Sequence, residues 1–107
     1  MTDPTFKQLL AQAERIRQGY HRLEDQHHGS RWTVEEDALA FLTDAALVGR
    51  LTMAQQQRWP ASNSEGQLEH KLAECVWWLM VLAKRTDIDL AAELDKFMGE
   101  TEGKVCR

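Results

Sequence analysis

The sequence predicts an all-α fold, and three observations support this. Apolar residues recur at steps of three and four along most of the chain, which is the spacing of one face of a helix. No segment alternates with the period of two that marks a strand, and the chain holds only two prolines. With 107 residues, 43% of them hydrophobic and 28% charged, it fits one globular domain covering residues 1–107. We expect a bundle of four to five helices.

The first two helices have clear ends. The first is expected over about residues 5–26, and Gly29 follows it as a residue that tolerates a left-handed cap. Thr33 and Glu36 then have the spacing of a capping box, in which each side chain bonds the backbone of the other. This pair predicts a second helix over about residues 34–57.

The third helix is the most apolar part of the chain. Trp59 and Pro60 end the helix before it, and residues 61–66 are expected to form a polar loop. The third helix covers residues 67–85, and Glu74 is its only charge between positions 72 and 83. A helix that is hydrophobic on all sides must be covered on all sides. Since the chain has few other helices, we expect a second copy to complete the core, in a homodimer or tetramer.

The C-terminal part of the chain predicts a short helix and a tail. Asp89 is a good N-cap for a helix over residues 90–98, and Gly99 is expected to end it. Residues 100–107 are polar, so we expect a flexible tail.

Charge and composition exclude several classes of function. There are 17 acidic against 13 basic residues and a formal net charge of −4, which argues against a DNA or RNA partner. A nucleotide remains compatible, because a bound metal can mask phosphate charge. No apolar run approaches the ~18 residues of a membrane span, and the N-terminus lacks a signal peptide pattern. The two cysteines form no disulfide framework, so we expect a cytoplasmic protein without a membrane partner.

Two acidic residues lie inside the most apolar helices. Asp44 and Glu74 are each flanked by hydrophobic residues, and a buried carboxylate has to be paired, protonated or bound to metal. Facing carboxylates in a helical bundle often hold a divalent cation, here magnesium or alternatively manganese. The other interpretation is an internal salt bridge with Lys71, Arg50 or Arg58.

Helical spacing extends this candidate metal site. Asp37 lies seven residues before Asp44, and His70 lies four before Glu74, so each shares a face with its acid. His21, Asp25 and His28 also share a face of the first helix, where we expect a solvated polar surface rather than a metal site.

Two tryptophans at loop positions are candidate ligand contacts. Trp32 follows Arg31, and Trp59 follows Arg58. Such pairs can stack on a base and contact a phosphate, although packing against the protein is an equally good interpretation. Within the third helix, adjacent tryptophans at positions 77 and 78 are expected to pack in the core or an interface.

The order of these segments resembles the MazG-like family of all-α nucleoside triphosphate pyrophosphohydrolases. The best stretch is residues 71–90, Lys-Leu-Ala-Glu-Cys-Val-Trp-Trp-Leu-Met-Val-Leu-Ala-Lys-Arg-Thr-Asp-Ile-Asp-Leu. In that family a Glu-Leu-Ala-Asp segment opens an apolar helix that ends before an Ile-Asp-Leu cap. Here Glu74 takes the place of the aspartate, and residues 88–90 match the cap. Residues 41–51 look like the preceding helix, which carries an EExxE motif in the family.

The resemblance implies a magnesium site, and this chain departs from it at several positions. The family binds magnesium through the acids of these two motifs and hydrolyses a triphosphate to monophosphate and pyrophosphate. Here Thr43 and Leu47 stand at glutamate positions of the first motif, and Lys71 stands at one of the second. Only Asp44 and Glu74 remain as carboxylates.

Two functions follow from this resemblance. One is a magnesium-dependent nucleotide pyrophosphohydrolase with Asp44, Glu74 and Lys71 as catalytic residues, the lysine contacting phosphate, and with Asp37 and Glu36 as substitute metal ligands. The alternative is a non-catalytic module of the same fold, with a decayed metal site, that binds a nucleotide or another protein.

Overall fold

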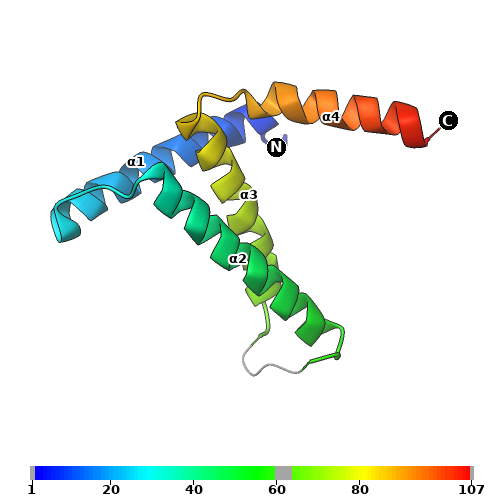
Figure 1. Ribbon diagram of the computed structural model, residues 1–107, viewed down its shortest axis with the longest axis horizontal. Coiled ribbons are helices and arrows are strands. Elements are labelled where there is room, and N and C mark those ends of the chain that lie inside the picture. Colours follow the sequence, from blue (N-terminus) through cyan, green and yellow to red (C-terminus); the bar gives the residue numbers. More distant parts are fainter. Residues whose placement is uncertain (1, 60–63, 107) are drawn as a thin grey trace.

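The computed structural model describes residues 2–59 and 64–106, and this part of the chain is all-helical. It holds α1 (Phe6–His28), α2 (Val34–Gln55), α3 (Gln67–Arg85) and α4 (Leu90–Val105), and no strand occurs within it (Figure 1). The all-α prediction is therefore confirmed. Pro60 and residues 61–63 of the expected loop lie outside the described residues.

The starts of the first two helices follow local chemistry. The Thr33 side chain accepts a hydrogen bond from the Glu36 backbone N–H, and Glu36 returns one, so the predicted capping box is confirmed. Thr5 and Gln8 form the same arrangement at the start of α1. Gly29 ends α1 with a φ of 74°, a left-handed conformation that glycine adopts without steric cost. These ends set the length of the short connection that carries Trp32.

The end of α4 differs from the prediction. We expected Gly99 to end this helix, but α4 continues to Val105. Positive φ occurs only at Gly29 and Gly66 among the described glycines, so Gly99 keeps a helical backbone. Glycine inside a helix costs about 1 kcal/mol relative to alanine, and good helix formers such as Met98, Glu100 and Glu102 lie beside it. Residues 100–105 are thus a helical extension rather than an irregular tail.

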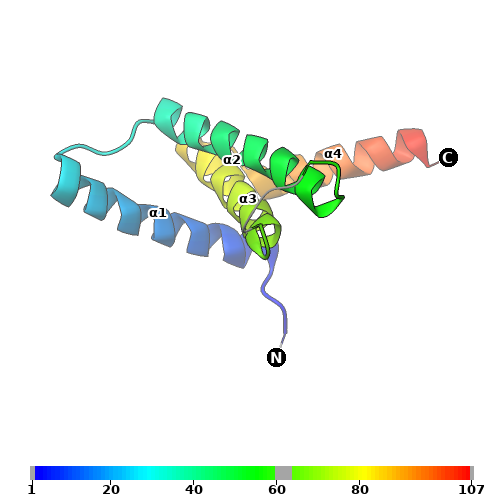
Figure 2. The ribbon, with the colours of Figure 1, turned by 90° about the horizontal axis from the view of Figure 1, so that it is seen from below.

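Helix α3 is the centre of the arrangement. It packs along α2 over most of its length, crosses α1, and touches the start of α4. Figures 1 and 2 show α1 and α2 on different sides of α3, while α4 leaves the body and points away from it. Residues of α1, α3 and the α1–α2 connection therefore meet around one end of α3.

The hydrophobic core of the chain is small. Trp78, Met80 and Val81 on α3 are buried, whereas Leu72, Val76 and Leu79 on the same helix are exposed. The radius of gyration is 16.6 Å, against about 13 Å for a compact domain of this length. Within the described chain, α3 is therefore left uncovered along one apolar face.

Candidate functional site

The Lys71 ammonium joins the two acids that the sequence singled out. Its Nζ lies 3.0 Å from Asp44 Oδ1 and 2.9 Å from Glu74 Oε1 (hydrogen bonds to both carboxylates). Lys71 and Glu74 are one turn apart on α3, and Asp44 faces them from α2. The hydrogen bonds to Glu74 and Asp44 raise the pKa of Lys71, so the ammonium stays charged. The two carboxylates do converge on a single cation, and that cation is a lysine of the same chain.

The second oxygen of Asp44 is also occupied. Trp78 Nε1 donates a hydrogen bond of 3.0 Å to Asp44 Oδ2. His70 Nε2 lies 3.6 Å from Glu74 Oε1 on the exposed side of the same cluster. Of the bases that the salt-bridge interpretation named, Lys71 is the one that pairs with these acids.

Asp37 belongs to a different cluster. Its side chain is 0% exposed, and its carboxylate lies 2.8 Å from Arg17 Nη2 and 2.8 Å from Arg85 Nη1. The Arg17 Nε donates a further hydrogen bond of 3.2 Å to the same carboxylate. Although Asp37 and Asp44 share α2, two arginines neutralise Asp37 and separate its role from that of the Lys71 cluster.

Glu24 connects this buried cluster to Trp32. Its carboxylate accepts hydrogen bonds from Arg17 Nη1 at 2.8 Å and from the Trp32 backbone N–H at 2.8 Å. Burial raises the pKa of Glu24, but the hydrogen bonds from Arg17, Trp32 and His21 lower it more, to about 2. Arg85 Nη1 also donates a hydrogen bond of 3.0 Å to the Trp32 carbonyl oxygen. Charged side chains therefore bind both the N–H and the carbonyl group of Trp32.

Sequence reasoning missed most of this cluster. His21, expected on a solvated surface, is buried and lies 3.1 Å from Glu24 Oε1 through its Nδ1. The available signal was the spacing of Ala13, Arg17, His21 and Glu24, which follow one another at helical steps. The buried Ala13 marks that face of α1 as the one turned inward.

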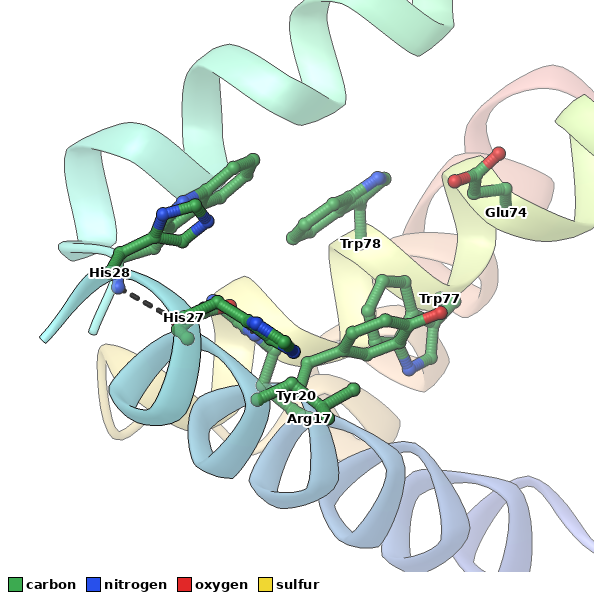
Figure 3. A pocket seen from close by; sticks show the side chains of 10 residues that line it. Arg17, Tyr20, His27, His28, Glu74, Trp77 and Trp78 are labelled. Atoms are coloured by element: carbon green, nitrogen blue, oxygen red, sulfur yellow. Dashed lines mark hydrogen bonds and ion pairs between the residues drawn. The ribbon is translucent and has the colours of Figure 1, made fainter. Parts of the chain in front are cut away.

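A cavity of about 710 Å³ lies beside these clusters, between α1, α3 and the connection that carries Trp32. Figure 3 shows Tyr20 close to Trp77, and Trp78 between the histidines at the end of α1 and Glu74. Aromatic rings and a few charged groups make up most of the lining. The lining residues are Arg17, Tyr20, Leu23, Glu24, His27, His28, Trp32, Glu74, Trp77 and Trp78. Its size and lining are typical of a pocket for a small organic molecule.

The aromatic side chains form a continuous wall of this pocket. The ring centroids of Tyr20 and Trp77 are 5.8 Å apart, and those of Trp77 and Trp78 are 4.6 Å apart. The Trp32 ring is nearly parallel to that of Trp78, with 6° between their planes and 6.5 Å between centroids. Trp32, for which the sequence left ligand contact and packing open, therefore lines this pocket and also faces Trp78. Trp77 and Trp78, which were expected to pack, line it too, as does Tyr20, which was not singled out.

The remaining predicted site residues lie elsewhere. Trp59 and Arg58 follow the far end of α2, whose 22 residues span about 33 Å. The Arg50 guanidinium carbon lies 5.0 Å from the centroid of the Trp59 ring, so this tryptophan has its own partner. Arg31 Nε pairs with Asp25 Oδ2 at 3.0 Å on the surface. Glu36 is engaged in the capping box of α2.

A metal site is not assembled in the described part of the chain. No group of three or more His, Cys, Asp or Glu side chains lies there in a position to hold a metal ion. Asp44 and Glu74 are the pair that could take one, with Lys71 displaced. None of the described helices is long and apolar enough to cross a membrane.

Comparisons with known proteins do not identify the chain. No family model matches its sequence, and neither a curated protein nor a solved structure matches it.

Proposed function

We propose that this chain is a self-associating, non-catalytic ligand-binding module of the MazG-like kind, in which the Lys71 ammonium replaces the magnesium of the resembling enzymes. One observation carries the proposal: Lys71 Nζ lies 3.0 Å from Asp44 Oδ1 and 2.9 Å from Glu74 Oε1. At a position where the resemblance expects a metal-binding glutamate, this chain therefore has the positively charged Lys71.

An ammonium keeps the two carboxylates together but does not perform the chemistry of the metal. Magnesium in a hydrolase lowers the pKa of a bound water and binds phosphate oxygens alongside the protein carboxylates. A lysine ammonium offers three donors and no coordination position for water. The substitute ligands considered above are also engaged, since Asp37 is paired with two arginines and Glu36 caps α2. These contacts favour binding without hydrolysis.

Self-association is supported by the surface area of the protomer. Its accessible surface is 8400 Å², whereas a compact monomer of this mass has about 6,100 Å². The excess of about 2,300 Å² is the area that each partner buries in the larger obligate interfaces. Exposed leucines and a valine are found on both of the packed helices: Leu39 and Leu42 on α2, and Leu72, Val76 and Leu79 on α3. A homodimer or tetramer that buries the apolar face of α3 would complete the core.

The second candidate is the magnesium-dependent nucleotide pyrophosphohydrolase. It is favoured by the convergence of Asp44 and Glu74 and by the partial exposure of Lys71, whose side chain is 24% accessible. Magnesium is commonly held by only one or two carboxylates together with substrate phosphates. If Lys71 moved out towards a phosphate, magnesium or manganese would bind the two acids.

A pyrophosphate-release assay over the common nucleoside triphosphates distinguishes the two candidates. We expect no magnesium-dependent release by the unmodified chain and no effect of magnesium on its melting temperature. Lys71→Glu restores the carboxylate that the resemblance expects and places three acids together. Magnesium should therefore raise the melting temperature of this variant by binding its native state.

The matched control is Lys84→Glu, which makes the same charge change on α3. Lys84 is exposed and lies 3.7 Å from Glu14 Oε2, away from the Lys71 cluster, so magnesium should leave its melting temperature unchanged. Magnesium-dependent pyrophosphate release by the unmodified chain, abolished in Glu74→Gln, would replace the proposed module with the hydrolase.

A further inference from the structure

The pocket beside the Lys71 cluster combines aromatic walls with an excess of negative charge. We infer that it binds a planar aromatic cation in preference to a nucleoside triphosphate, an inference that rests on the proposed non-catalytic function. The juxtaposition that carries it is Glu74 at the edge of a cavity walled by Tyr20, Trp32, Trp77 and Trp78.

The charges around the pocket do not cancel. In the buried cluster two arginines, Arg17 and Arg85, balance two carboxylates, Asp37 and Glu24. In the neighbouring cluster the single ammonium of Lys71 faces both Asp44 and Glu74. His70 Nε2 also lies 3.6 Å from Glu74 Oε1, and His21 Nδ1 lies 3.1 Å from Glu24 Oε1. With these two imidazoles neutral, one negative charge is left over, and Glu74 brings it to the pocket lining.

The pocket offers little to a phosphate group. Among the described residues that line it, Arg17 is the only arginine or lysine, and its guanidinium already bonds the carboxylates of Asp37 and Glu24 at 2.8 Å each. The other basic side chains of the lining are His27 and His28, imidazoles in the last turn of α1. A triphosphate without a metal would therefore bring several negative charges next to Glu74, whose carboxylate shares a single ammonium with Asp44, and this is unfavourable.

The aromatic walls favour the opposite charge. A cation over the face of tryptophan or tyrosine is attracted by the negative face of the ring, and sites with several such rings recognise organic cations. The protein uses this interaction itself, since the Arg17 guanidinium carbon lies 5.9 Å from the centroid of the Trp78 ring. Tyr20 and Trp32 remain partly exposed and can cover a ligand ring from two sides of the pocket.

Isothermal titration calorimetry with three guanine derivatives tests the inference without metal. Guanosine is uncharged, 7-methylguanosine carries a positive charge on the same ring system, and guanosine triphosphate adds negative charge to it. We expect 7-methylguanosine to bind roughly tenfold more tightly than guanosine, the fold-change of a well-placed cation–π contact. Guanosine triphosphate should bind most weakly. Raising the salt concentration should reduce the preference for the cation on the unmodified chain.

Two substitutions on α3 separate the pocket charge from the overall charge. Glu74→Gln should lower the preference for 7-methylguanosine several-fold, because it removes the excess negative charge from the lining. Glu69→Gln makes the same change on an exposed residue of the same helix that does not line the pocket, and should leave the preference unchanged. Trp32→Leu should weaken all three ligands, because it removes a ring from the wall.

Several results would overturn the inference. They are equal affinities for guanosine and its methylated form, tightest binding of the triphosphate without metal, or no binding of any of the three. Each of these leaves the pyrophosphate-release and magnesium results unaffected. Failure of the ligand class and failure of the non-catalytic function are therefore distinguishable.

Discussion

The buried pairing of Asp37 predicts a large loss of stability in Asp37→Asn. This side chain is 0% exposed and contacts two arginines at 2.8 Å. The amide would leave Arg85 without its carboxylate and Arg17 with Glu24 alone, and breaking a buried ion pair in this way costs about 3–5 kcal/mol. For a domain of this size each kcal/mol shifts the melting temperature by about 4–8 °C. The melting temperature should therefore fall by about 12 °C or more.

The measurement is a thermal melt followed by circular dichroism, and its matched control is Asp25→Asn. Asp25 also pairs with an arginine, but the side chains of Arg31 and Asp25 are 53% and 45% exposed. An exposed pair contributes about 0–1 kcal/mol, so this variant should shift the melting temperature by only a few degrees. All proteins are compared at one chain concentration, because the proposed self-association would make the melting temperature concentration-dependent.

The comparison can refute the reasoning directly. Similar small shifts in both variants would mean that burial does not make the ion pairs of Asp37 contribute more to the free energy of unfolding than an exposed pair does. The assignment of this cluster as the support of Trp32 would then fail as well.

Three further predictions follow from the same contacts. Asp44→Asn should lower the free energy of unfolding by about 1–3 kcal/mol, since it removes one of the two carboxylates around Lys71. Magnesium should not change the melting temperature of the unmodified chain. A stabilised variant, together with a magnesium response of the unmodified chain, would favour the metal site. The pKa of Glu24 is lowered from 4.5 to about 2, so its stabilisation is present above pH 4.5 and is lost as the pH falls towards 2. Urea unfolding over this range should show a steeper acid loss for the unmodified chain than for Glu24→Gln, and parallel curves would contradict the assigned contacts. Leu79→Arg should dissociate the proposed assembly while the helices remain, because Leu79 is exposed in the single chain. Val81→Arg should unfold the chain itself, because Val81 is only 2% exposed. A folded monomer of the unmodified chain in light scattering would exclude the self-association.

Much of the helical structure was predictable because its determinants are local. Thr33 and Glu36 are three residues apart, so their capping box forms within one turn whatever the rest of the chain does. Gly29 ends α1 for an equally local reason. Gly99 was misjudged, because a glycine ends a helix only where the chain takes a left-handed conformation, and here it remains helical.

The requirement that Asp44 and Glu74 be compensated was also present in the sequence, since a carboxylate inside an apolar helix has to find a partner. The sequence left the partner open between a metal ion and several bases. Lys71 was selected by the packing of α2 against α3, which brings its ammonium 3.0 Å from a residue 27 positions earlier.

Only the tertiary structure revealed the cluster around Asp37. Arg17 and Arg85 lie 20 and 48 positions away from it, and they meet because α1 and α2 both pack on one end of α3. Each arginine looks like an ordinary polar residue of an amphipathic helix when its own helix is considered alone. The sequence by itself therefore determined where the helices begin and that Asp44 and Glu74 need a partner. The crossing of the helices decided which partner each group has, because distances across elements depend on packing and not on spacing along the chain.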